Sequence, residues 1–394
     1  MAQQVLVYRL TGSSAALGII SFIGLIPLIP LSLWSGSISD RFSKRTVILA
    51  AQCLMLVQAL LLALLTWLGT IQVWQIYLMA FFLGAANAVD LPARQAFTVD
   101  MVEGKEDLTN AIGLNSTMFN SARALGPAMA GLVVATTGES MAFFINALTF
   151  IAVIISLMMM RNLPKPNQPD KSVNLIRHMG EGFRFITGQQ AIMVLMGLIA
   201  VSAFLSMPYN TLMPVFAGDV LKESAAPVIN SVCGGAIPFI HCQTPEALPL
   251  GILLTMVGVG AVIGALVVAS MPNQSARGFL LTLGNIGFPL TLLAFATSKS
   301  FLLSAFLLIL VGISFVIQNA LANTILQIIT PDAVRGRVMS LYTMVFQTTM
   351  RLGGLQAGLA AEWIGAPVSV GFGAIICLFY SIFIVFRYPR LRKL

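Results

Sequence analysis

Charged residues are scarce in this sequence. Only 9% of the 394 residues are Asp, Glu, Lys or Arg, while 58% are hydrophobic and the mean hydropathy is +0.91. A soluble globular domain carries about 25% charged residues. Because a chain of this size with so few charges could not keep its surface in water, we expect lipid to cover much of it. The shortage of charge therefore excludes an ordinary soluble protein.

The sequence also lacks the features that most enzymes, metalloproteins and secreted domains need. Its two histidines, His178 and His241, have no third ligand nearby, so no metal site is expected. It has no glycine-rich phosphate loop with a lysine and no nucleophile–base pair at recognisable spacing, so we expect no ATP-driven step, no enzyme activity and no cofactor. Met1 leads straight into AQQVLVYRLTGS without a basic segment, so no cleavable signal peptide is expected.

Long uncharged runs are what the sequence has instead. A helix needs about 20 apolar residues to cross the hydrocarbon core of a membrane. The runs of that length lie at 10–39, 46–89 (which holds two), 140–160, 185–218, 247–276, 278–298, 300–331 and 363–386. Two further stretches, 109–136 and 338–362, each carry one central arginine. We therefore predict an all-α polytopic membrane protein with eleven full spans and an apolar stub at the N-terminus.

Basic residues collect in alternate connections between these spans. Of the 22 Lys and Arg residues, 17 fall in one set of connections, whereas the opposite set holds only Arg9, Lys222 and Lys299. Connections rich in Lys and Arg face the cytoplasm. This places the C-terminus in the cytoplasm of a bacterium and the spans in its plasma (inner) membrane. The net charge of +8 is then a consequence of topology, and no nucleic acid partner is expected.

One polar connection divides the chain. Residues 161–190 are proline-bearing at first and then place apolar residues at helical spacing, a pattern typical of an amphipathic helix on the membrane surface. This cytoplasmic linker separates an N-terminal half, 1–160, from a C-terminal half, 191–394. The two halves echo each other, because Arg123 and Arg351 each precede a glycine by three residues. A duplicated six-helix half is how many secondary carriers are built.

The first cytoplasmic connection carries a specific motif. It runs from Gly36 through Asp40 and Arg41 to Lys44 and Arg45. This resembles the signature between helices 2 and 3 of the major facilitator superfamily. The resemblance implies that Asp40 latches the two halves together in the outward-facing state. The alternative is an ordinary basic connection.

The resemblance extends along nearly the whole chain. LVYRLTGSSAALG, DLPARQAF, NSARALGPAMAG and PDAVRGRVMSLY are similar to the drug and siderophore exporter branch of that superfamily, which includes enterobactin exporters. Gly126, Pro127 and Gly131 partly match a helix 5 pattern associated with antiporters. Proline frees a backbone carbonyl and glycine permits tight packing, so this segment is a candidate hinge between the halves. The alternative is a helix that is merely kinked.

The sequence departs from the family pattern at two places. AQQVLVYRLTGS resembles the outer end of helix 1 and the connection after it, so roughly half of helix 1 is expected to be missing. After helix 8, where the first-loop signature should recur, only Arg277 remains of its charged residues. We therefore expect an asymmetric latch.

Arg123 and Arg351 are the candidate substrate-binding or coupling residues. An arginine at mid-bilayer costs about 2.5–3.5 kcal/mol on insertion scales, so each is expected to face the protein interior or a wet cavity. Each could instead bond only to carbonyls of a broken helix. Asp90 is expected either to join the cytoplasmic charge cluster of the latch or simply to end its helix before Pro92.

Cys233 and Cys242 lie in a long external connection, at about 220–249. Outside the cytoplasm they could form a disulfide, and two free thiols are the alternative.

These observations favour a secondary exporter of small amphipathic molecules that works by alternating access and is expected to be proton-coupled. Its expected partners are the small-molecule substrate and the lipid bilayer, and the chain is expected to be a monomer. The alternatives are a truncated, transport-inactive carrier and a membrane protein with no transport role.

Overall fold

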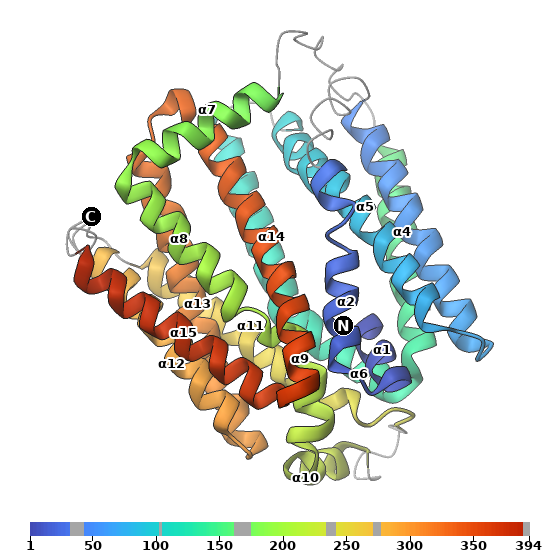
Figure 1. Cartoon of the computed structure of the whole chain (residues 1–394). Helices are drawn as coiled ribbons and strands as arrows, with labels where there is room; N and C mark the ends of the chain where they lie inside the picture. The colour runs from blue at the N-terminus through green and yellow to red at the C-terminus, as the bar shows by residue number, and fades with distance from the viewer. Residues whose placement is uncertain (32–42, 102–104, 161–174, 234–241, 271–276, 389–394) are drawn as a thin grey trace.

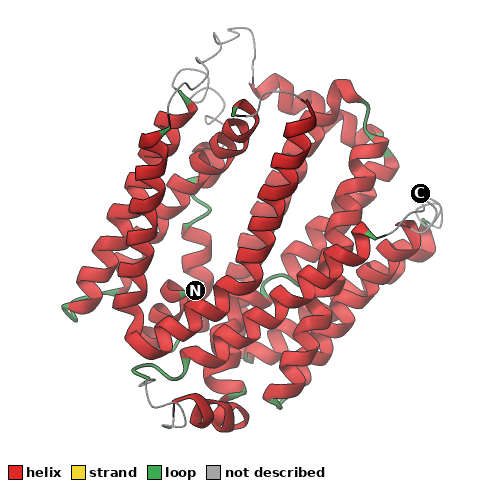
Figure 2. Cartoon of the chain, turned by 180° about the vertical axis from the view of Figure 1, so that it is seen from behind, coloured by secondary structure: helices red, strands yellow, loops and turns green. Residues whose placement is uncertain are grey.

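The computed structural model describes the chain except for residues 32–42, 102–104, 161–174, 234–241, 271–276 and 389–394. Helices make up most of the described part, short loops and turns connect them, and no strand is present there (Figure 2). Its elements, in chain order, are α1 (Ala2–Thr11), α2 (Ser14–Ile23), α4 (Lys44–Trp67), α5 (Val73–Asp100), α6 (Lys105–Met159), α7 (Leu175–Gly188), α8 (Gln190–Leu205), α9 (Tyr209–Val215), the π-helix η1 (Phe216–Val220), α10 (Lys222–Cys233), α11 (Ala247–Ala269), α12 (Arg277–Thr297), α13 (Phe301–Ile329), α14 (Asp332–Ile364) and α15 (Ala366–Arg387).

The predicted all-α architecture is confirmed. Nine helices of the described part are long and apolar enough to cross a membrane, and they correspond to the nine uncharged runs of the sequence. The two predicted spans that carry a central arginine form the first part of α6 and most of α14. The amphipathic segment of the predicted linker forms α7, while residues 161–174 lie outside the described part.

Polar caps and glycines set the ends of these helices. The Ser13 and Ser43 hydroxyls accept hydrogen bonds from Ala16 N and Thr46 N, which caps α2 and α4. Within α6, Gly138 has φ 79° and ψ 172°, a conformation that side chains rarely tolerate. The single element α6 is therefore two spans joined at Gly138.

The external connection differs from the sequence-based expectation. A loop was expected over about 220–249, but residues 222–233 form α10. Leu221 and Ala225 are fully buried, so this helix is anchored by its apolar residues against the bundle. The span predicted within 185–218 corresponds to residues 190–220, and turns at Ser206 to Pro208 separate α8 from α9 within it.

The helices form two halves whose ends can be told apart (Figure 1). We call the end where α7 lies the linker end and the end where α10 lies the disulfide end. Helices α1 to α6 make up the N-terminal half, and α8 to α15 make up the C-terminal half. The ribbons of α2 and α14 lie side by side at the disulfide end and separate toward the linker end, in both views.

Apolar side chains cover the outside of the bundle as well as its core. Trp67, Trp363 and Phe386 are 80%, 88% and 79% exposed. Such exposure is unfavourable in water but suits a surface covered by lipid, and Trp is enriched at membrane interfaces. The core of the C-terminal half is built around aromatic rings, among them Phe216 and Phe295 with centroids 4.7 Å apart.

Candidate functional site

The two halves meet along two helix pairs, α2 with α14 and α6 with α11. Glycines permit the closest approaches. A Cβ added to Gly358 would lie 2.8 Å from Gly18 Cα, and a Cβ added to Gly131 would lie 2.5 Å from Gly251 Cα. Small residues at such crossings let helix backbones pack directly in a membrane, where dispersion replaces the hydrophobic effect. We call this contact surface the seam.

Polar contacts cross the seam near the disulfide end. Glu362, at the end of α14, accepts hydrogen bonds from the Ser13 hydroxyl (2.9 Å) and from Ala15 N (3.0 Å). Its carboxylate therefore sits at the N-terminus of α2, where unpaired N–H groups favour negative charge. The Tyr8 hydroxyl donates to the Asp219 carboxylate across the same end. These contacts join the halves at the disulfide end.

Arg351 also lies on α14, closer to the linker end than Glu362. Its Nη1 is 3.4 Å from the backbone oxygen of Ser21, and a Cβ added to Gly24 would lie 2.6 Å from the same nitrogen. The guanidinium therefore lies against the backbone of α2, across the seam. Its Nε is buried and has no hydrogen-bond partner. A buried donor without an acceptor is uncommon and favours a ligand that supplies one.

The remaining substrate-binding candidate and the three hinge candidates lie on α6. Arg123 lies on α6, but its side chain is outside the described part. Gly131 is buried at the crossing with α11, and a Cβ added to Gly251 would lie 3.0 Å from Pro127 O. Gly126 has no other atom within 4 Å of an added Cβ. The structure thus brings two of the three hinge candidates to the seam, and their role as a hinge stays a prediction.

The predicted latch is only partly described. Gly36, Asp40 and Arg41 lie outside the described residues. Lys44 begins α4, and Arg45 Nη2 donates to Met158 O over 2.7 Å, which caps the end of α6.

Asp90 is 4% exposed and forms a buried polar cluster on the linker side of the N-terminal half. Its Oδ1 accepts from Gln52 Nε2 (3.0 Å), and both of its oxygens accept from Arg94 (3.2 Å each). Helix α5 continues through Pro92 to Asp100, so the idea that Asp90 simply ends its helix is wrong.

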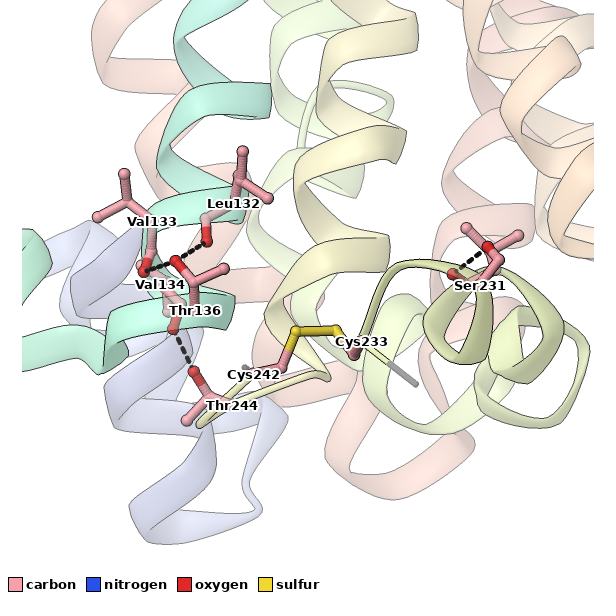
Figure 3. The surroundings of a disulfide bond; sticks show 9 residues. Leu132, Val133, Val134, Thr136, Ser231, Cys233, Cys242 and Thr244 are labelled. Carbon is pink, nitrogen blue, oxygen red and sulfur yellow. Dashed lines mark hydrogen bonds between the residues drawn. A yellow bond between two sulfur atoms is a disulfide. The ribbon is translucent and has the colours of Figure 1, made fainter. Parts of the chain in front are cut away.

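A disulfide joins Cys233 and Cys242, with Cα atoms 5.4 Å apart (Figure 3). It ties the end of α10 to the segment that leads into α11. Directly after it, the Thr244 amide donates to Ala135 O over 3.0 Å, and the Thr244 hydroxyl donates to Val134 O. These carbonyls lie beside the break at Gly138. We call residues 242–246 the strap, because they reach from the C-terminal half to α6.

Sequence reasoning missed a cluster of charges at the disulfide end. Glu139 is 2% exposed and pairs with Arg9 at 3.2 Å. The predicted spans 109–136 and 140–160 end on either side of it, so the sequence gives no sign that its side chain is buried. Asp219 was missed because its partner Tyr8 lies more than two hundred residues away in the chain.

Comparison with known proteins agrees with this architecture. The family model MFS_3, described as transmembrane secretion effector, matches residues 1–394. The chain is 27% identical to the staphyloferrin A transporter of Staphylococcus aureus over 64% of its own length and 57% of that relative. It is 24% identical to macrolide efflux protein A of Streptococcus pyogenes over 53% of its length and 52% of that relative. The chain thus spans little more than half the length of these two relatives.

A longer match is found with the enterobactin exporter EntS of Shigella boydii, at 24% identity over 91% of this chain and 80% of that protein. Among solved structures, the nucleoside transporter NupG superposes with a TM-score of 0.72, at 13% identity, over 99% of this chain and 93% of that one. At that identity the likeness concerns the fold, which is the two-half fold of major facilitator transporters.

Proposed function

Because this chain belongs to the transmembrane secretion effector family of major facilitator transporters, we propose that it exports small amphipathic molecules by alternating access. In such a cycle, a binding site between two halves is open first to one side of the membrane and then to the other. The relatives that support export as the direction are named as a macrolide efflux protein and an enterobactin exporter.

The observation that carries the proposal is Arg351 at the seam. Its guanidinium lies against the backbone of α2 in the other half, with a buried, unpartnered Nε. A transported molecule with a carboxylate, catecholate, carbonyl or hydroxyl oxygen would supply the missing acceptor. Arg351 is therefore proposed to bind the substrate, whose apolar part would contact the surrounding helices.

The membrane orientation is proposed from the basic residues. The linker end carries most of them and is assigned to the cytoplasm of a bacterium, so the C-terminus is cytoplasmic too. The conformation then has its halves joined on the outer side, as expected of an exporter that accepts substrate from within. Coupling to protons is proposed from the family resemblance. Asp90, which is buried in its cluster with Arg94, is a candidate for the titrating acid.

Export is tested in cells that lack their own drug pumps and siderophore exporters. Expression of the full chain is expected to lower the accumulation of a fluorescent amphipathic drug or to increase siderophore in the medium. Arg351→Gln is expected to reduce that effect at least about tenfold, the result of losing a charged hydrogen bond worth about 1.5–3 kcal/mol. Lys299→Gln, which changes an exposed cation at the disulfide end, is the matched control.

The two variants are compared at equal amounts in the membrane fraction. Equal export by the Arg351→Gln variant and the native chain would rule out Arg351 as a substrate-binding residue. No export of any tested compound by the native chain would contradict the proposed function itself. In proteoliposomes, an imposed pH gradient is expected to drive uptake of an exported compound, and its failure would contradict proton coupling alone.

A further inference from the structure

A cavity lies at the disulfide end, and Arg351 is not among the residues that line it. Its volume is about 680 Å³, within the range of about 300–1,000 Å³ typical of small-molecule sites. The N-terminal half contributes α1 and the Gly138 break of α6 to its walls. The C-terminal half contributes η1, α10, the strap and the start of α11. The cavity is therefore built by both halves.

The cavity lining carries more negative than positive side chains. The carboxylates are those of Glu139, Asp219 and Glu246, and the cations are those of Arg9 and Lys222. Each cation already has an acidic partner, at 3.2 Å for Arg9 with Glu139 and 3.1 Å for Lys222 with Glu246. The remaining acid, Asp219, is bonded to the neutral Tyr8 hydroxyl. The lining thus has one negative charge without a cationic partner.

The cavity lining also lacks a hydrogen-bond donor for the Glu139 carboxylate. Its side chain is 2% exposed, Oε2 contacts Arg9, and Oε1 is buried without any hydrogen-bond partner. A buried carboxylate oxygen left without a donor is costly, so a native site that keeps one is expected to receive a donor from outside the chain. The occupant should therefore bring both a positive charge and an N–H group.

The geometry disfavours a metal ion as this occupant. Within the described residues, no three Asp, Glu, His or Cys side chains converge as metal ligands would. The cavity is also far larger than one ion requires, and Val5, Pro214, Ala217 and Leu250 give it apolar wall. An ammonium group carrying a hydrocarbon body would match both the acidic and the apolar parts.

We propose that this cavity is a binding site for a protonated amine with an apolar body, held by Glu139 and Asp219. The ammonium donates to Glu139 Oε1 and neutralises the charge on Asp219, while its hydrocarbon part contacts the apolar wall. Because Glu139 belongs to the N-terminal half and Asp219 to the C-terminal half, the bound amine bridges the seam. Such a ligand stabilises the conformation in which the disulfide end is closed.

Benzylammonium is a suitable probe, with benzyl alcohol as its neutral counterpart. Both are titrated into the purified full chain in detergent micelles at constant ionic strength, and the unfolding temperature is recorded. Benzylammonium is expected to raise Tm saturably, as any ligand specific for the folded state does. Benzyl alcohol is expected to give no saturable rise. Equal effects of the two compounds would overturn the proposal, because apolar partition alone would then explain binding.

Variants connect the binding to the proposed residues. Glu139→Gln and Asp219→Asn are each expected to weaken benzylammonium binding at least about tenfold. Glu223→Gln, an exposed acid on α10 that does not line the cavity, is expected to leave it unchanged. The double variant Arg9→Gln with Glu139→Gln removes both members of the ion pair, so it avoids leaving Arg9 unpaired if the single variant folds poorly. Native-like binding in the Asp219 and double variants would overturn the proposal.

Discussion

At the scale of single residues, the polar groups inside this protein are few and mostly paired. Asp90 shows the rule, since a carboxylate that is 4% exposed receives donors from both Gln52 and Arg94. Arg351 Nε and Glu139 Oε1 are two of the nine buried side-chain atoms of the described residues that have no hydrogen-bond partner, and both lie where the two halves meet. Under the proposed function, these two atoms are candidates for hydrogen bonds to a bound ligand.

The Asp90 cluster yields a stability prediction. Asp90→Ala leaves the amide of Gln52, a residue that is 3% exposed, without its acceptor, and should destabilise the protein by about 1–3 kcal/mol. The measurement is the unfolding temperature of the purified chain in detergent. Glu223→Ala, at an exposed position, serves as the control and should leave Tm unchanged. Equal Tm values for the two variants would show that the cluster contributes nothing to stability.

At the scale of helices, the sequence predicted where the membrane spans lie better than it predicted which segments contact one another. Apolar runs located the spans within a few residues, because the length of a membrane helix is set by the bilayer. The break at Gly138 falls between the predicted spans 109–136 and 140–160, whereas the helix α10 was not foreseen, since it depends on packing against segments distant in sequence. A backbone carbonyl was one of the two expected kinds of partner for Arg351, but the sequence could not show that the carbonyl would be that of Ser21.

The crossing of α6 and α11 predicts a steric effect. Gly251→Val would place a side chain against Gly131 Cα, which lies 2.7 Å from an added Cβ, and overpacking of this kind costs about 1–3 kcal/mol. We expect a lower Tm and faster hydrogen exchange in residues 131–138. Gly126→Ala, where no other atom lies within 4 Å of the new methyl, is the control and should behave as the native chain. Native exchange in the Gly251 variant would argue against close packing at the seam.

The disulfide that precedes the strap can be tested directly. Mass spectrometry without reductant is expected to find the peptide that contains Cys233 and Cys242 lighter by two hydrogens than after reduction. Cys53 and Cys377, which are free, should keep the same mass in both conditions. Reduction should also speed exchange of the Thr244 amide, because the strap that holds it against Ala135 O loses its anchor. A peptide at full reduced mass before reduction would contradict the bond.

At the scale of the whole molecule, two half-bundles share one seam. The hydrogen bonds of Glu362 and Tyr8 across it lie at the disulfide end. Glycine-to-glycine crossings keep the halves close without interlocking large side chains. The alternating access that we propose requires the contacts at the disulfide end to break once in every transport cycle.

A reversible cross-link tests that requirement most directly. Ser13→Cys and Glu362→Cys, whose native side chains are 2.9 Å apart across the seam, are introduced into a chain with its four native cysteines replaced by Ser. They are joined with a short bis-methanethiosulfonate linker, and each single-cysteine chain is the control. Our account predicts that the cross-link abolishes export and that reductant restores it. Undiminished export by the cross-linked chain would contradict alternating access.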